Sequence, residues 1–379
     1  MSTRLKAWLA NARTPLAICV GNRLALFVFV YLGLVVQGDV DHSLRAFPQN
    51  LFLDGWFRWD SGHYVAIVRD GYQIIPDSLQ QRTNFWPLYP LVVRAANWIV
   101  GNPFIAGFIV SNLALVCACV LLHRWSFRRF GADVARRTVT LLLSFPFAFY
   151  FSAMYTESVF LLTVVGAFYF SDRGCWLAAS LCAAAAGATR LVGVAILLPI
   201  LLTYGEQHRW RVANFRRDIF WLWLGFAGPL AHVFFLQYRF GDGLAFLSSQ
   251  WVPGWGNDSD WSRLARLLGR LTEWRHLATG TYDSIAAVNL VFGVFALLVC
   301  LVGWRKIGLA ACAWGAITML VSLRIWASSG RYAVVVWPVY LGIALFTRRR
   351  PILYQSTIVG FCLLQALLAF WFTHGHWVA

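Results

Sequence analysis

The sequence predicts an all-α polytopic membrane protein, built as a single transmembrane domain of about eleven helices over residues 1–379. Hydrophobic residues make up 59% of the 379 positions and charged residues only 13%, whereas a soluble domain carries about a quarter charged residues. Apolar runs of spanning length recur from near Leu16 to Phe372. The basic residues gather in alternate connecting segments, as in a multi-pass membrane protein.

The apolar runs define the spans in order. They are expected at residues 17–36, 103–122, 138–153, 156–171, 175–189, 191–204, 218–238, 285–303, 307–323, 333–347 and 352–372. As one helix, residues 175–204 would be about 45 Å long at ~1.5 Å per residue, against a hydrocarbon core of ~30 Å. The run also carries Arg190 in its middle, so we expect two short helices that turn at residues 187–190.

The charge distribution sets the orientation. With the N-terminus inside, the inner segments hold 18 of the 32 basic residues and four of the 16 acidic residues. Merging residues 175–204 into one span would invert every later segment and remove this asymmetry. We therefore expect the N-terminus inside, the C-terminus outside and a multi-pass plasma (inner) membrane location, or the ER membrane in a eukaryote. The formal charge of +16 follows from the positive-inside rule and does not indicate a nucleic-acid partner.

Two long outer loops are expected, at residues 37–102 and 240–284. Residues 86–100 are apolar but short and interrupted by proline, so an interfacial or re-entrant helix is expected there. No small-residue cleavage site follows the apolar segment near Leu24–Val36, so we expect a retained first span and no cleavable signal peptide. The eight cysteines include no Cys-x-x-Cys pair and the histidines form no ligand set, so we expect neither a metal nor a cofactor.

The first outer loop carries the most informative motif, Phe57-Arg58-Trp-Asp60-Ser-Gly-His63-Tyr64. A sugar transferase that uses a lipid phosphate needs a base for the acceptor hydroxyl and cations for the departing phosphate. Asp60 fits the base, with Arg58 or His63 positioning it. The alternative is that Asp60 pairs with Arg58 or caps a helix. Asp54, six residues earlier, is expected to matter less.

A second acidic position lies where two short spans meet at the outer face. Pro146 interrupts the first of these spans, and Glu157 opens the second. Carboxylates in membranes face cavities or partners, and short proline-interrupted spans often line sites. The alternative is that Thr156 and Glu157 only cap the helix start.

Outer-face arginines are the third signal. Arg190 lies at a helix junction, Arg324 and Arg331 flank Ser328-Ser329-Gly330, and Tyr332 follows directly. Guanidinium groups present paired donors that suit a lipid phosphate. The alternative for each arginine is a side chain that snorkels from a helix end to the interface.

These motifs together resemble the family of the second mannosyltransferase of glycosylphosphatidylinositol assembly, a family of the GT-C glycosyltransferase superfamily. The resemblance is carried by Arg58-Trp-Asp60-Ser-Gly-His63-Tyr64, Gly71-Tyr72, Phe85-Trp86-Pro87-Leu88-Tyr89-Pro90, Phe145-Pro146 through Tyr155-Thr156-Glu157-Ser158, Ala188-Thr189-Arg190, Ser329-Gly330-Arg331-Tyr332 and Trp337-Pro338. It covers most of the chain in order. The chain departs from the family pattern at Asn84-Phe85-Trp86, where a more uniformly Phe-rich run is expected.

The resemblance implies a GT-C-type bundle and an inverting transfer of mannose, without an essential metal, from a polyprenyl- or dolichyl-phosphate donor to a glycolipid acceptor. It places the essential acid of the first outer loop at Asp60. Glu157 and His63 are then expected to orient sugar or acceptor, and Arg190 and Arg331, with Tyr332, to bind the donor phosphate. A prokaryotic homologue is expected.

Two other readings of the sequence stay open. One is a GT-C transferase of another sugar, such as glucose or an aminoarabinose, because sugar choice depends on a few pocket contacts. The other is a sugar-lipid transporter with no chemistry. The acid-containing outer loops and the scarcity of charge deep within most spans favour an enzyme.

Overall fold

A computed structural model describes residues 3–37, 46–47, 49–74, 82–248, 261–279, 283–323 and 328–378. This described part is helical and contains no strand. Its elements, where η marks a 3-10 helix, are α1 (Thr3–Val36), α2 (Leu51–Asp54), α3 (Asp60–Asp70), α4 (Leu88–Val100), α5 (Pro103–Phe130), α6 (Ala132–Ser144), η2 (Ala148–Phe151), α7 (Glu157–Ser171), α8 (Trp176–Thr189), η3 (Leu191–Ile196), α9 (Leu197–Gln207), η4 (Val212–Asn214), η5 (Arg217–Phe226), α10 (Ala227–Phe240), α11 (Ala245–Ser248), α12 (Trp261–Thr272), α13 (Trp274–Thr279), α14 (Ser284–Ile307), α15 (Leu309–Ser322), α16 (Ser329–Ala333), α17 (Pro338–Phe346) and α18 (Pro351–Thr373). The all-α prediction is confirmed.

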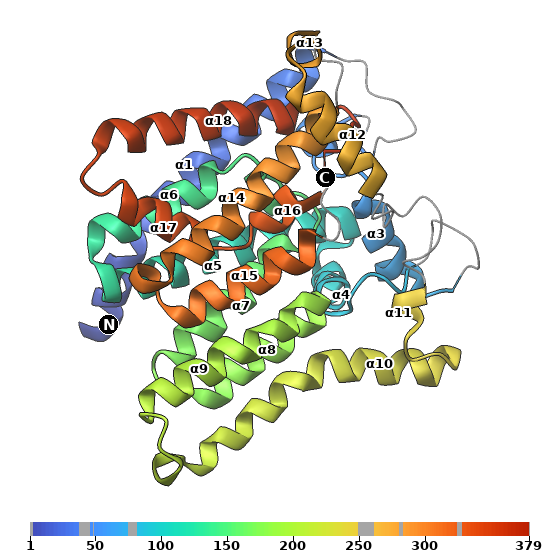
Figure 1. Ribbon diagram of the computed structural model, residues 1–379. Helices are drawn as coiled ribbons and strands as arrows, with labels where there is room; N and C mark the ends of the chain where they lie inside the picture. Colours follow the sequence, from blue (N-terminus) through green and yellow to red (C-terminus); the bar gives the residue numbers. More distant parts are fainter. Residues whose placement is uncertain are drawn as a thin grey trace.

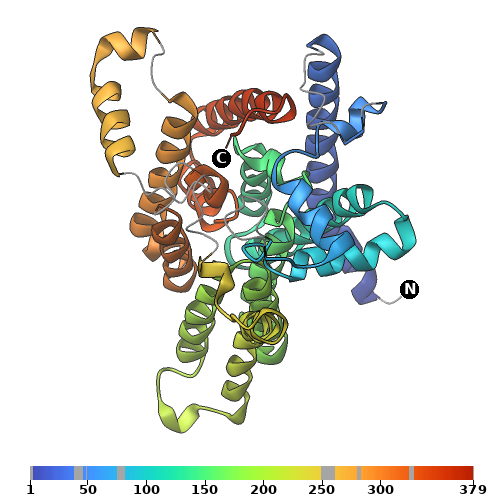
Figure 2. The ribbon, with the colours of Figure 1, turned by 90° about the vertical axis from the view of Figure 1, so that its right-hand side faces the viewer.

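The long helices run side by side, with the N-terminus at one end of the bundle and the C-terminus toward the other, near α3 and α12 (Figure 1). Seen from that second end, the C-terminus lies near the middle of the helices (Figure 2). In the described residues five helical stretches are long and apolar enough to cross a membrane: Ala12–Val36, Pro103–Phe130, Arg217–Phe240, Ser284–Ile307 and Pro351–Thr373. Shorter apolar helices fill most of the other expected positions. The count of eleven crossings stays a prediction.

The split of residues 175–204 is confirmed. Helix α8 ends at Thr189, and Arg190 has an extended backbone with φ −153° and ψ 141°. The chain then continues through η3 into α9. The extended backbone of Arg190 therefore turns the chain between α8 and the next helical segment.

The third expected span, residues 138–153, is wrong as a continuous helix. Helix α6 ends at Ser144, and Phe145 is extended with ψ 140° because it precedes Pro146. Residues 145–156 form only the short η2 before α7 begins. Irregular backbone inside a membrane protein needs internal hydrogen-bond partners, and two polar side chains provide them. Arg23 of α1 donates to the carbonyls of Leu143 (3.0 Å) and Ala148 (2.8 Å), and Gln365 of α18 donates to Leu143 (3.0 Å) and Phe145 (3.1 Å).

The loop over residues 37–102 contains α2, α3 and α4, and α4 confirms the helix expected over residues 86–100. Tyr89 and Val93 of α4 are fully buried, whereas Trp98 and Ile99 at its end are exposed. This one-sided burial suits a helix that lies over the bundle. In the second outer loop, Leu267 of α12 packs against Ala286 and Ala287 of α14.

Helix orientation can be tested by cysteine labelling, because the exposed Gln207 and Arg349 are expected inside and the exposed Ser262 outside. Each is changed to cysteine in a background without Cys117 and Cys175, the exposed native thiols. A membrane-impermeant maleimide should label position 262 in intact cells or sealed vesicles, and positions 207 and 349 only after permeabilisation. Labelling of positions 207 and 262 from the same side would contradict the crossing at residues 217–240. Labelling of position 207 from outside with position 262 protected would contradict the orientation derived from charge.

Candidate active site

Three segments far apart in the sequence meet at Arg331. Its Nη1 lies 2.8 Å from Oδ2 of Asp60, and its Nε lies 2.5 Å from Oε1 of Glu157. Nη2 of Arg190 lies 3.0 Å from the same Glu157 oxygen. The structure therefore brings together four of the residues predicted from the sequence: two carboxylates and two guanidinium groups of balancing charge.

Helix starts position both carboxylates. Asp60 is the first residue of α3 and Glu157 the first residue of α7. The partial positive charge at a helix N-terminus stabilises a carboxylate there. Thr156 makes no side-chain capping bond, and Glu157 binds two arginines, so capping does not account for these residues.

The two carboxylates differ in accessibility. The side chain of Glu157 is fully buried, whereas that of Asp60 keeps 19% of its surface exposed. A group that takes a proton from an incoming hydroxyl must be within reach of that hydroxyl. Asp60 meets this condition. Glu157 is enclosed by its two arginines, so it can hold their guanidinium groups in place but is out of reach of an incoming hydroxyl.

Aromatic rings surround the arginines. The guanidinium carbon of Arg331 lies 4.5 Å from the ring centre of Tyr155 and 5.1 Å from that of Tyr150. Arg190 lies 4.8 Å from the ring centre of Tyr332. Cations over aromatic faces are stabilised electrostatically, more so when both are desolvated. Arg190 and Arg331 are therefore built-in parts of the site, and the snorkelling alternative fails for both. Arg324 lies outside the described residues.

The backbone before Asp60 is strained. Trp59 has a φ of +54°, which is rare for residues other than glycine. Such conformations cost on the order of 1–3 kcal/mol and persist where the surroundings enforce them. The surroundings here are the C-terminal segment: the Trp59 indole donates to the carbonyl of His376 (3.3 Å) and packs edge-on against Trp377.

Arg58 pairs with Asp54 and not with Asp60, so any effect of Arg58 on Asp60 is indirect, through the turn that joins α2 to α3. Its Nη2 lies 2.7 Å from Oδ2 of Asp54, and both side chains are fully buried. Arg58 also donates to the carbonyl of Thr373 at the end of α18 (3.0 Å). Asp54 accepts in addition from the backbone N–H of Phe47 (2.9 Å). Asp54 and Asp60 both lie close to Arg58 in the sequence, and the turn between α2 and α3 brings Asp54 into contact with it. This buried pair therefore anchors the loop.

His63 lies one turn along α3 from Asp60 and stacks on Phe85, with ring centres 4.9 Å apart. Burial lowers the pKa of His63, the charge of Asp60 opposes this shift and that of Arg82 adds to it. The imidazole is therefore neutral near pH 7. A neutral His63, stacked on Phe85, lies close to Asp60 and contributes no positive charge there.

Asn289 is a functional residue that the sequence analysis missed. Its Oδ1 accepts from the backbone N–H of Gly330 (3.0 Å), and its backbone carbonyl accepts from the Ser329 hydroxyl (2.8 Å). Its Nδ2 donates to the carbonyl of Val378 (2.9 Å). Asn289 thereby fixes the start of α16, where Arg331 lies. The available signal was a lone amide in the apolar run of α14.

Gly330 must be glycine for packing reasons. A Cβ at this position would lie 2.4 Å from ring carbons of Phe147 and 2.9 Å from Oδ1 of Asn289. The close approach of α16 to the irregular segment after α6 therefore depends on the missing side chain, and it places Arg331 over Tyr150 and Tyr155.

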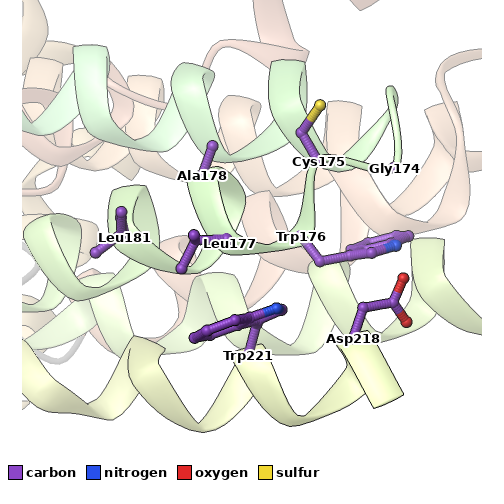
Figure 3. Close-up of a pocket in the computed structure, with 8 residues that line it drawn as sticks. All are labelled: Gly174, Cys175, Trp176, Leu177, Ala178, Leu181, Asp218 and Trp221. Carbon is purple, nitrogen blue, oxygen red and sulfur yellow. The ribbon is translucent and has the colours of Figure 1, made fainter. Parts of the chain in front are cut away.

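Two hollows lie away from the four charges. A mostly apolar groove of about 300 Å³ separates α3 and α4 from α10, with Ile67, Leu91 and Ala231 among its lining. A second hollow lies between the start of α8 and η5, walled by Trp176 and Trp221 with Asp218 beside them (Figure 3). Glu157 begins α7 and Gly174 follows the end of α7 at Ser171, so this second hollow is roughly 20 Å from the charges. In the described residues no three His, Cys, Asp or Glu side chains are grouped as a metal ion would require.

Comparison with known proteins supports the resemblance seen in the motifs. No protein-family profile matches the chain. The chain is 30% identical over 165 residues to GPI mannosyltransferase 2 from two strains of Cryptococcus neoformans var. neoformans serotype D. The match spans 40% of this chain and 38% of those relatives, well under half of their length.

A solved structure is similar over more of the chain. It is that of ArnT from Cupriavidus metallidurans bound to undecaprenyl phosphate, with a TM-score of 0.50 and 16% identity, covering 92% of this chain and 63% of that one. At this identity the likeness concerns the fold. It supports the predicted all-α bundle of membrane helices.

The Arg58–Asp54 pair can be tested through stability. Arg58→Ala strands a fully buried carboxylate, which typically costs about 3–5 kcal/mol, so the purified protein should lose thermal stability in detergent. Arg136→Ala is the matched control, because Arg136 and its partner Asp133 are 49% and 43% exposed and such pairs contribute about 0–1 kcal/mol. Stability equal to wild type in Arg58→Ala, with turnover alone reduced, would return Arg58 to a catalytic role.

Proposed function

We propose that this chain is an integral-membrane mannosyltransferase. It transfers mannose from a polyprenyl- or dolichyl-phosphate donor to a lipid-linked glycan acceptor at the outer face, with inversion. The observation that carries the proposal is the joining of a partly exposed Asp60 to Arg331, with Arg190 bound to the same cluster. A base beside phosphate-binding cations is the equipment that this reaction requires.

Arg331 and Arg190 are the proposed phosphate ligands. A phosphodiester carries one negative charge, and guanidinium groups bind its oxygens through paired N–H donors. In the described residues both arginines face carboxylates. An arriving phosphate therefore competes with Asp60 for Arg331, and the Asp60 oxygen that it displaces is left free to accept a proton.

The transfer is a single displacement. Asp60 accepts the proton of an acceptor hydroxyl while that oxygen forms a bond to the anomeric carbon. The bond from this carbon to the phosphate oxygen breaks, and its electron pair leaves with the lipid phosphate, held by the arginines. Attack from the side opposite the leaving group inverts the anomeric configuration. Glu157 keeps Arg331 and Arg190 in place throughout, because it binds both.

The similarities support the sugar and the carrier. GPI mannosyltransferase 2 is, by its name, a mannosyltransferase, and the ArnT structure was determined with undecaprenyl phosphate bound. Together they favour mannose on a polyisoprenoid phosphate as the donor of this chain. A transferase of another sugar is distinguished by offering different lipid-phosphate sugars to the purified protein. A transporter would give no product with any of them.

The groove between α4 and α10 is the proposed seat of the donor's hydrocarbon chain. Its lining is mostly apolar, and Ile67, on its wall, belongs to the same helix as Asp60. A lipid whose phosphate lies on the arginines therefore reaches the groove along α3. Burying methylene groups there contributes about 0.8 kcal/mol each, which favours a long isoprenoid chain over a short one.

The base can be tested with Asp60→Asn, which preserves side-chain size and removes the proton acceptor. General-base catalysis is worth roughly 10²–10⁴ in rate, so kcat with decaprenyl-phosphate mannose should fall at least a hundredfold while donor affinity survives. Asp70→Asn, on the same helix and half exposed, should keep wild-type turnover. GDP-mannose should not replace the lipid donor. Near-normal kcat in Asp60→Asn would remove the proposed base, and direct use of GDP-mannose would overturn the donor class.

The groove can be tested with Ala231→Trp, which fills it with an indole. The KM for decaprenyl-phosphate mannose should rise several-fold, because the long chain loses apolar contact. The KM for a short citronellyl-phosphate mannose should change little, since that chain barely enters the groove. Equal effects on the long and the short donor would place the hydrocarbon chain elsewhere.

A further inference from the structure

Buried polar atoms without partners gather around Glu157. In the described residues, Oη of Tyr150, Oε2 of Glu157 and Nη1 of Arg190 are inaccessible to solvent and make no hydrogen bond. Tyr150 and Glu157 are fully buried as whole residues. All three belong to the site, because Glu157 binds Arg190 and Arg331, and Arg331 lies over the Tyr150 ring.

Such atoms need a physical explanation. Folded proteins pair most buried polar groups, and an unpaired one costs about 1–3 kcal/mol. Unpartnered buried polar atoms also occur elsewhere in the described residues, among them Nε1 of Trp314 and Oγ1 of Thr318, whereas the buried charged side chain of Arg58 donates to Asp54 and to backbone carbonyls. The three atoms here stand apart because two of them belong to a carboxylate and a guanidinium group that pair within the proposed site. Three polar atoms without hydrogen-bond partners beside the proposed base and phosphate ligands indicate groups that bind a ligand.

The chemistry of the three atoms identifies the part of the ligand. A carboxylate oxygen accepts a hydrogen bond, a guanidinium nitrogen donates one, and a phenol does both. A phosphate has no proton to give Glu157 at neutral pH and would be repelled by it. Sugar hydroxyls donate and accept, so they match the set.

The position of Glu157 selects one hydroxyl. Its Oε1 contacts the two arginines proposed to bind the donor phosphate, so its Oε2 lies one carboxylate width from them. In a glycosyl phosphate the hydroxyl nearest to the phosphate oxygens is the one on C2, next to the anomeric carbon. Hydrogen bonds to a 2-hydroxyl also strengthen in transition states that develop positive charge at the anomeric carbon.

We propose that Glu157, Arg190 and Tyr150 form the hydroxyl subsite for the donor hexose, and that Glu157 recognises its C2 hydroxyl. This inference rests on the proposed function, because it assumes that the arginines hold a glycosyl phosphate. Glu157 is then a specificity-determining residue, whereas Asp60 is the base. A site built to bind a hydroxyl discriminates strongly against a substrate that lacks it, because the protein group is left unpaired.

Binding measurements without acceptor test the proposal independently of turnover. The Kd values of decaprenyl-phosphate mannose and of its 2-deoxy analogue are compared for wild type and Glu157→Gln. A hydrogen bond to a charged group is worth about 1.5–3 kcal/mol, so wild type should bind the 2-deoxy donor at least tenfold more weakly. In Glu157→Gln that penalty should shrink to under about threefold. An equal penalty in both proteins would overturn the assignment of C2 to Glu157.

Tyr150→Phe provides the second variant, which keeps the fold because the deleted hydroxyl has no partner. Its thermal stability should match or exceed that of wild type, and its affinity for decaprenyl phosphate without sugar should be unchanged. Its affinity for the mannosyl donor should fall several-fold. Wild-type affinity for the mannosyl donor in this variant would exclude Tyr150 from the subsite.

The two proposals fail in different ways. If wild type binds decaprenyl-phosphate mannose no better than decaprenyl phosphate and forms no product, the proposed function and this inference fall together. If wild type transfers mannose, yet the 2-deoxy penalty is independent of Glu157, the subsite alone is overturned.

Discussion

The rest of the site depends on the two ion pairs that the guanidinium of Arg331 makes with Asp60 and Glu157. These carboxylates lie 271 and 174 positions away from Arg331 in the chain. In a low-dielectric interior an ion pair is stable only if every charge has partners and good geometry, and the loss of one partner strands the others. The first outer loop, the start of α7 and α16 are therefore held in one arrangement. Arg190 completes the charge balance at Glu157.

Irregular backbone makes that meeting possible, and dedicated side chains stabilise it. A straight helix over residues 138–153 would place Tyr150 on one of its turns, whereas the break after Ser144 lets the rings of Tyr150 and Tyr155 lie beside the guanidinium of Arg331. The exposed carbonyls of the break would be costly in a membrane. Arg23 and Gln365, from the first and last long helices, bind them. A deeply buried arginine in α1 thus stabilises the irregular segment through two backbone carbonyls and the Ser152 hydroxyl.

The C-terminal segment has a comparable supporting role for Asp60, the proposed base. Carbonyls of Thr373 and His376 accept hydrogen bonds from Arg58 and Trp59, the two residues that precede Asp60. The buried Arg58–Asp54 pair ties the same turn to α2. The positive φ of Trp59 persists because both sides of the turn are held. Asp60 consequently projects from a rigid helix start and keeps part of its surface open to a substrate.

The sequence by itself determined the helical membrane fold, the division of residues 175–204 at Arg190, the helix in the first outer loop and four members of the site. These features depend on apolar run length, proline position and the scarcity of charge in spans, which are local properties. Only the tertiary structure decided which charges meet. Local spacing offered Arg58 to Asp54 and Asp60 alike, and the turn between α2 and α3 assigned it to Asp54. The break at residues 145–156 and the part played by Asn289 were also decided there, because both depend on helices that approach from distant parts of the chain.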